Sequence, residues 1–109
     1  MHNPSYEFHG VPTETARYVV TDTAQVFAAA QYTRNGKSAI AALITCEDHP
    51  VRFCLGGSTP VVDVLGHILY VGQSVRIVNP YAVRTFSYIN HTAQSAAVLQ
   101  ITFEFEPGA

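Results

Sequence analysis

Short segments in which apolar and polar side chains alternate run through the second half of this chain, and turn-forming residues separate them. The clearest segment covers residues 96–106, and Gly, Pro, Ser and Asn fill intervals such as 56–60 and 90–95. Successive side chains of a strand point to opposite faces, so the pattern predicts strands with one buried and one solvated face. Eight or so such strands predict a single-domain, all-β protein, an antiparallel β-sandwich that is jelly-roll-like.

The last strand shows which side chains we expect on each face. Those predicted to be buried are Leu99, Ile101, Phe103 and Phe105, and those predicted to face water are Gln100, Thr102, Glu104 and Glu106. The remaining candidate acids are Asp22, Glu47, Asp48 and Asp63. Glycosidase chemistry needs two carboxylates facing one cleft, and we interpret all of these acidic groups as solvated surface charge instead.

The connections between strands are marked by turn residues. The Asn-Gly pair in residues 34–37 predicts a tight turn, because it supplies the positive φ values that such turns need. Residues 38–46 and 51–55 are predicted to form a hairpin around the turn at 47–50. Residues 24–32 contain three consecutive alanines, but we interpret them as strand or irregular extended structure. The other predicted elements are strands at 17–20, 68–71, 74–78 and 85–89 and one helical turn at 81–84.

The first sixteen residues are polar and aromatic and are interrupted by prolines. We predict that residues 1–16 form an extended N-terminal arm without regular structure, and that residues 17–109 form the β-sandwich domain. Chain termini are usually poorly ordered unless something ties them down. Four apolar side chains in or next to this arm are the candidate assembly contacts: Tyr6, Phe8, Val11 and Tyr18.

The composition excludes several partners. Of the 109 residues, 48% are hydrophobic and only 13% are charged, against about 25% in ordinary domains. Two explanations of the low charge content remain open. Other subunits could cover part of the surface, since interface cores are depleted in charge, or uncharged Ser, Thr, Asn and Gln could supply the polar surface. The six basic residues form no patch, and no apolar stretch reaches the length of a membrane helix, so we expect neither nucleic acid nor membrane as a partner.

No motif for catalysis, metal binding or cofactor binding is recognised. The five histidines lack the H-x-H spacing that a cupin-type metal enzyme needs, and we interpret His49, His67 and His91 as turn residues. Cys46 and Cys54 are too few for a disulfide framework, and we interpret them as free core cysteines of a protein folded in a reducing cytoplasm. We therefore expect no enzyme activity, no metal and no cofactor.

The order of the short motifs resembles that of small virion proteins of tailed bacteriophages. The resemblance covers roughly residues 38–105 and rests on segments 51–60, 66–69, 72–74, 82–86 and 97–103. It implies a capsid decoration (cement) protein, made in the host cytoplasm and bound in many copies to the outside of the head. Its partners would be the major capsid protein and copies of itself, as a homo-oligomer.

Two alternatives remain open at this stage. A tail or neck component of the virion would show the same motifs. A small carbohydrate- or ligand-binding β-sandwich would use exposed tyrosines to stack on sugar rings, and the candidates are Tyr32, Tyr70, Tyr81 and Tyr88.

Overall fold

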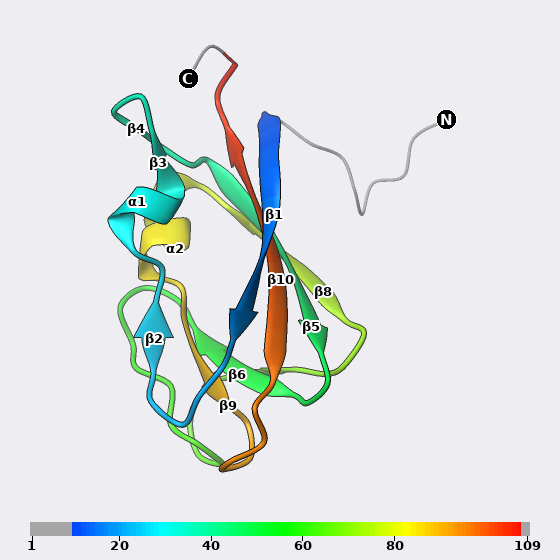
Figure 1. Cartoon of the computed structure of the whole chain (residues 1–109). Helices are drawn as coiled ribbons and strands as arrows, with labels where there is room; N and C mark the ends of the chain where they lie inside the picture. The colour runs from blue at the N-terminus through cyan, green and yellow to red at the C-terminus, as the bar shows by residue number, and fades with distance from the viewer. Residues whose placement is uncertain (1–9, 108–109) are drawn as a thin grey trace.

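The computed structural model describes residues 10–107, in which strands dominate and two short helices lie between them (Figure 1). The elements are β1 (Val11–Val19), β2 (Gln25–Val26), α1 (Ala29–Tyr32), β3 (Thr33–Arg34), β4 (Lys37–Ser38), β5 (Ala41–Glu47), β6 (Val51–Cys54), β7 (His67–Leu69), β8 (Ser74–Val78), α2 (Pro80–Thr85), β9 (Ser87–Asn90) and β10 (Val98–Phe105). The all-β class predicted from the alternating pattern is confirmed.

Two four-stranded antiparallel sheets contain most of the strands. The first sheet has the order β1-β10-β5-β8 and the second has the order β2-β9-β6-β7, while β3 and β4 form a separate hairpin. The first sheet joins the beginning, middle and end of the chain, so its order depends on long-range pairing. The blue β1 and the orange β10 run side by side in Figure 1.

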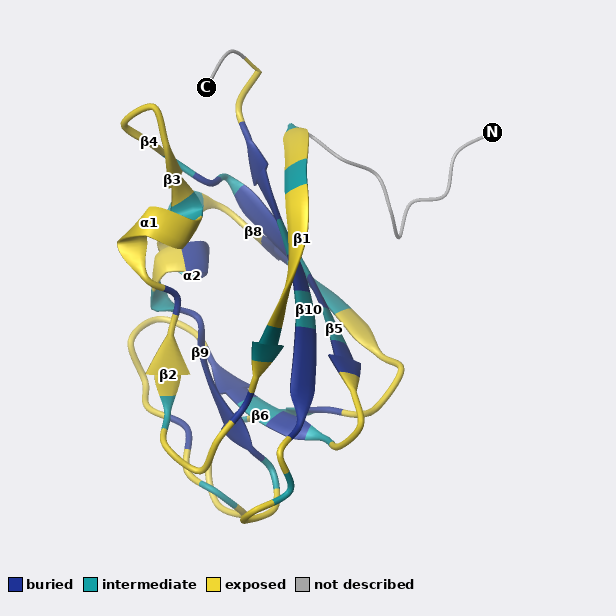
Figure 2. Ribbon diagram, viewed as in Figure 1, coloured by how far each residue is buried: buried dark blue, intermediate teal, exposed yellow. Residues whose placement is uncertain are grey.

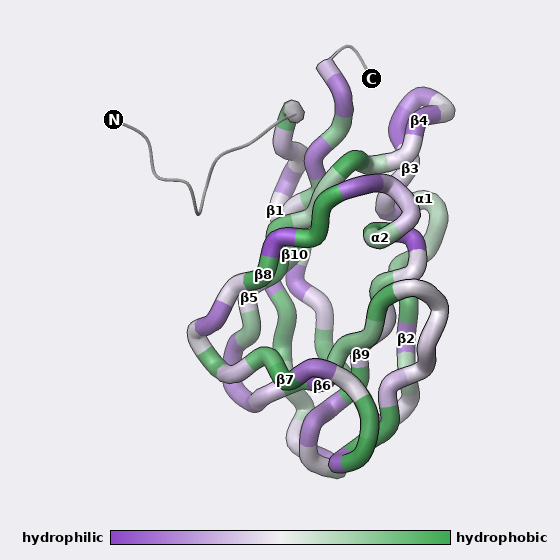
Figure 3. Tube along the Cα trace, turned by 180° about the vertical axis from the view of Figure 1, so that it is seen from behind, coloured by the Kyte–Doolittle hydropathy of each residue, from purple (hydrophilic) through white to green (hydrophobic). Residues whose placement is uncertain are grey.

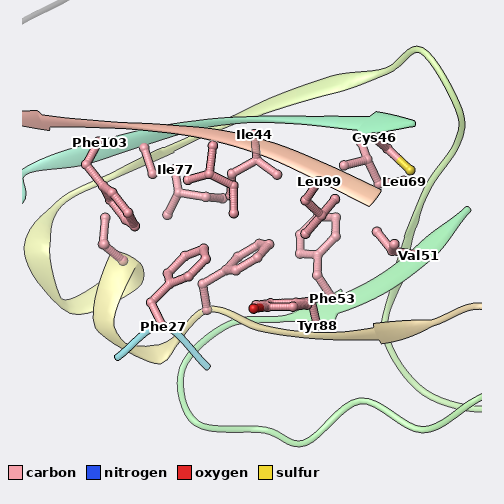
Figure 4. Close-up of a cluster of buried hydrophobic side chains, with 14 of the residues drawn as sticks. Phe27, Ile44, Cys46, Val51, Phe53, Leu69, Ile77, Tyr88, Leu99 and Phe103 are labelled. Atoms are coloured by element: carbon pink, nitrogen blue, oxygen red, sulfur yellow. The ribbon is translucent and has the colours of Figure 1, made fainter. Parts of the chain in front are cut away.

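One apolar core lies between the two sheets (Figure 4). The first sheet contributes Ile44, Leu99 and Phe103, and the second contributes Val51 and Phe53, all buried. The inward set predicted for the last strand is confirmed, because Leu99, Ile101, Phe103 and Phe105 are all buried.

Aromatic rings fill the centre of this core. Phe27, which follows β2, stacks on Phe86 with ring centroids 5.4 Å apart and meets Phe103 edge-on at 5.1 Å. Phe86 also stacks on Phe53 at 5.3 Å. Such ring pairs contribute about 0.5–1.5 kcal/mol beyond their burial. Phe27 also contacts Tyr88 of β9, with centroids 5.7 Å apart, so it connects the two sheets through Phe103 and Tyr88.

The predicted hairpin of residues 38–46 and 51–55 is wrong. β5 pairs with β10 and β8 in the first sheet, whereas β6 pairs with β9 and β7 in the second. Both strands direct apolar side chains to the same core, so they face each other across it instead of pairing at their edges. The turn between them, in which Asp48 has a φ of 70°, carries the chain from one sheet to the other.

The interpretation of residues 24–32 as extended is wrong in its second half. β2 is extended, but residues 29–32 form the helical turn α1. The backbone N–H of Ala28 donates to Oε1 of Gln31 at 2.7 Å, which satisfies one of the free donors at the start of this turn. Two other predictions are confirmed: the Asn-Gly turn joins β3 to β4, and α2 contains the predicted helical turn.

The predicted arm of residues 1–16 is wrong from residue 11 onward, because residues 11–16 belong to β1. This strand pairs with β10 from Val11 opposite Phe105 to Val19 opposite Val98. Gly10 allows the close approach at its start, since a Cβ there would lie 2.3 Å from the carbonyl oxygen of Phe105. The part of the predicted arm that comprises residues 1–9 lies outside the described residues.

Candidate assembly surfaces

Strand β1 forms one edge of the first sheet. It is hydrogen-bonded to β10 on one side, and seven of its nine residues are exposed, whereas the neighbouring β10 is almost entirely buried (Figure 2). An edge strand presents backbone N–H and C=O groups that can pair with another chain. β1 is therefore a candidate interaction surface made of main-chain groups.

An open groove of about 710 Å³ runs along β1. It is lined by residues 12–16 and Tyr18 of β1, by Gln31, Thr33 and Arg34 on the opposite wall, and by Phe103 and Phe105 of β10. We call it the β1 groove. Its walls combine hydroxyl, amide and charged groups with aromatic rings, so it suits an amphipathic polypeptide segment better than a small apolar ligand.

Two of the four predicted assembly residues lie on β1. Val11 is exposed, but Tyr18 is half-buried, and its ring meets Phe27 edge-on with centroids 5.9 Å apart. Burial raises the pKa of Tyr18, and a hydrogen bond with Gln31 opposes this shift. Tyr18 thus packs on its own domain and lines the β1 groove. Tyr6 and Phe8 lie outside the described residues.

The loop of residues 55–66, between β6 and β7, is a second surface that the sequence analysis did not identify. It exposes four large apolar side chains, Leu55, Val61, Val64 and Leu65, and Val64 is 74% exposed. Parts of this loop are green, the colour of hydrophobic residues, in Figure 3. The apolar residues 61–65 are visible in the sequence, but their exposure depends on the fold.

Hydrogen bonds hold the 55–66 loop in one shape. The N–H of Val61 donates to the carbonyl of Leu65 at 3.0 Å, and the N–H of Asp63 donates to the carbonyl of His91 at 3.1 Å. At the base of the loop, Arg52 donates to the carbonyl of Gly66 at 3.1 Å. The loop therefore presents its apolar side chains from a fixed backbone, which lowers the entropy lost when a partner binds.

The acidic group of Glu104 was predicted to be solvated, and this prediction is wrong. Its side chain has no exposed surface and pairs with Arg76 of β8, with a shortest N–O distance of 2.7 Å. The pair crosses over β5, because β5 separates β8 from β10 in the first sheet. Gly10 also donates to Oε1 of Glu104 at 3.4 Å. Glu104 thus connects the start of β1 to the opposite edge of the sheet.

The two cysteines are free and buried, as predicted. Burial raises the pKa of the Cys46 thiol to about 11, and burial also raises the pKa of Cys54. The thiolate is the reactive form of cysteine, so neither group is suited to nucleophilic chemistry near neutral pH. The thiol of Cys46 donates instead to the carbonyl of His49 at 3.0 Å.

The interpretation of His67 as a turn residue is wrong, because it lies in β7, whereas His49 and His91 lie in bends between strands. The side chains of His67 and His91 both have partners. Nδ1 of His91 accepts a hydrogen bond from Nε of Arg52 at 3.0 Å, and the His67 ring lies 5.4 Å from that of Phe53. Within residues 10–107, no group of three or more His, Cys, Asp or Glu side chains is placed to hold a metal ion. The helices described are also too short and too polar to cross a membrane.

The tyrosines proposed for sugar stacking are not equivalent. Tyr88 is buried, which makes its predicted exposure wrong, and burial raises its pKa to about 12. Tyr32 is half-buried against the core. Tyr70 and Tyr81 are exposed, but the guanidinium of Arg84 lies 5.8 Å from the Tyr81 ring centroid. Tyr70 is therefore the one candidate of the four with an exposed ring and no described ring contact.

Comparison of the chain with protein-family models, with curated proteins and with solved structures found no match.

Proposed function

We propose that this chain is a structural protein of a tailed-bacteriophage virion, most simply a capsid decoration protein bound across the boundaries between capsomers. Its partners would be the major capsid protein and further copies of itself. In this proposal the two sheets form a jelly-roll-like β-sandwich that acts as a rigid support for its contact surfaces. The motif order of residues 51–103 and the low content of charged residues support this role.

The single observation that carries the proposal is the apolar 55–66 loop. Contiguous exposed apolar surface on a small protein commonly marks an interaction site. Here four large apolar side chains are exposed on a backbone fixed by Arg52 and by the turn between Val61 and Leu65. A decoration protein needs a fixed contact of this kind, because it stabilises the assembled particle only by binding it more strongly than the free subunits.

The first experiment measures the copy number of the protein in purified virions, relative to the major capsid protein, by quantitative mass spectrometry. Near-stoichiometric copies support decoration. A few copies per particle would indicate a location in the tail or neck, and absence from the particle refutes the virion role.

A second experiment tests the loop itself on particles that lack the protein. Val64→Asp places a charge at the most exposed apolar position of the loop and should abolish rebinding. The matched control is Val78→Asp, an exposed valine of β8 in the other sheet, which should rebind normally. Equal rebinding of both variants refutes a contact through the 55–66 loop.

A further inference from the structure

The main-chain groups on the free side of β1 can be assigned residue by residue. The N–H of Val20 donates to the carbonyl of Ala97 at 2.8 Å, so at this residue the backbone points toward β10. The direction alternates along an antiparallel strand. The N–H and C=O groups of Thr15, Arg17 and Val19 therefore point away from β10. No hydrogen bond joins these groups to another segment within residues 10–107.

This edge is unlike the other three edges of the two sheets. β2 has two residues, β7 has three and β8 has five, whereas β1 has nine. Short edge strands are one of the ways in which proteins prevent unwanted pairing. β1 is therefore the edge with the longest row of free main-chain groups in the described part of the chain.

Only half of β1 is protected against pairing. Pro12 and the irregular register between Pro12 and Thr15 interrupt the first half, and both prolines and bulges discourage the addition of a strand. From Thr15 to Val19 the register with β10 is continuous. This five-residue segment can accept a complete new strand.

The β1 groove lies beside the same segment and would receive side chains of an added strand. Residues of the new strand that lie opposite Ala16 and Tyr18 would point to the inner side, toward Tyr18 and Phe103. Residues opposite Thr15, Arg17 and Val19 would point to the outer face. In strand addition, main-chain hydrogen bonds supply affinity and such side-chain sites supply specificity.

The charge of Arg17 determines which kind of strand can pair with residues 15–19. Arg17 is the central residue of the regular segment and the one charged group in it. If a second copy paired with this segment by two-fold symmetry, the register that uses all three free residues would place Arg17 opposite Arg17 of the other copy. Like charges directly opposite each other destabilise a strand pair, and opposite charges stabilise it. The edge is thus unfavourable for self-pairing and favourable for an acidic strand.

We propose that residues 15–19 of β1 accept an extended segment of a different polypeptide, which carries an acidic residue opposite Arg17 and apolar residues directed into the β1 groove. This inference goes beyond the virion role, because it depends only on the edge and its charge. It holds or fails independently of the 55–66 loop.

The test uses the full chain, labelled with ¹⁵N, and the capped peptide Lys-Thr-Leu-Glu-Leu-Thr-Lys. The central Glu is designed to lie opposite Arg17, and the two Leu residues point inward. We expect slower amide hydrogen exchange on peptide binding at Thr15, Arg17 and Val19. The amides of Ala16 and Tyr18, which already face β10, should change little. A peptide with Lys in place of the central Glu is the control and should bind more weakly.

Two variants make the test specific. Arg17→Glu should weaken binding of the Glu peptide about threefold to tenfold and strengthen binding of the Lys peptide by a similar factor. Val19→Pro removes an N–H that points away from β10, so the fold should persist while peptide binding falls, and Val19→Thr serves as its control.

Three outcomes would overturn the proposal. The first is a lack of protection at Thr15, Arg17 and Val19 at millimolar peptide. The second is equal binding of the two peptides to both the original chain and Arg17→Glu. The third is concentration-dependent protection of the same amides without peptide, which would make a second copy the occupant.

Discussion

The edge of β1 and the 55–66 loop are both exposed, but they expose different groups. β1 offers backbone groups around Arg17 that have no partner within residues 10–107, next to a groove of mixed polarity. The loop has its backbone tied by internal hydrogen bonds and offers apolar side chains, with Val64 the most exposed.

This difference predicts how each surface tolerates mutation. Backbone pairing depends little on side-chain identity. Substitutions in β1 by proline or glycine, or substitutions that change its charge, should therefore alter strand binding, whereas other substitutions should have little effect on it. Apolar contact depends on the side chains themselves, so a single charge in the loop should be enough to disrupt it. The predictions below separate the two surfaces, beginning with the largest expected effect.

Removing one member of the buried ion pair should destabilise the β1 side most. Arg76→Met removes the guanidinium that pairs with the buried carboxylate of Glu104 and should lower the free energy of unfolding by about 3 kcal/mol, measured in urea. Adding Glu104→Met to this variant should recover most of the loss. Amide exchange should increase at β1 and remain unchanged in the 55–66 loop, and the opposite distribution would contradict the connection through Glu104.

Raising the pH should loosen the core that both surfaces share. The folded pKa of Cys46 is about 11, above its ordinary value of 9.0, because burial disfavours the thiolate. The raised pKa of Cys46 therefore contributes fully to the free energy of unfolding below pH 9. About 2 kcal/mol of this free energy is lost as the pH rises toward 11. Cys46→Ala should remove this part of the pH dependence in urea unfolding measured from pH 7 to 11. An identical slope in both proteins would exclude Cys46 as its source.

Two glycines allow each surface to be loosened separately. A Cβ at Gly10 would meet the Phe105 carbonyl, and Gly66 has a φ of 125° and would place a Cβ 3.1 Å from the Phe53 carbonyl. Each Gly→Ala substitution should cost about 1–2 kcal/mol. Amide exchange should increase in β1 for Gly10→Ala and in the 55–66 loop for Gly66→Ala. Gly36→Asn in the β3–β4 turn is the control, since Asn tolerates positive φ there.

The smallest effect on folding should come from Val64→Asp. The side chain is largely in water, so the free energy of unfolding should change by no more than about 0.5 kcal/mol. Paired with the loss of particle binding proposed above, this result would assign the loop to function instead of stability. A large loss of stability would show that Val64 packs more tightly than its exposure indicates.

The alternating pattern predicted local structure well. In β10 the period of two identified all four inward side chains, because that period is a property of the extended backbone itself. The Asn-Gly turn and the helical turn in α2 were found for a similar reason, since both depend on the conformational preferences of neighbouring residues.

Most of the errors involve partners that are distant in sequence, and the helical turn α1, with its local hydrogen bond from Ala28 to Gln31, is the exception. Glu104 seemed solvated because Arg76 lies 28 residues earlier in the chain. The strands β5 and β6 seemed to form a hairpin because they are adjacent, although each pairs with other strands. The prolines of residues 1–16 seemed to mark an arm, whereas residues 11–16 belong to β1 and Gly10 permits a close contact with Phe105.

The sequence by itself determined the all-β class, the positions of strands such as β5, β8 and β10, and the apolar side chains that the last strand buries. These follow from the period of the strand and from turn chemistry, which act over a few residues. The tertiary structure alone decided the strand order, the buried ion pair, the free edge at Arg17 and the exposure of the 55–66 loop. The physical reason is that pairing and burial are set by residues brought together from distant parts of the chain, and a single local pattern is compatible with several such arrangements.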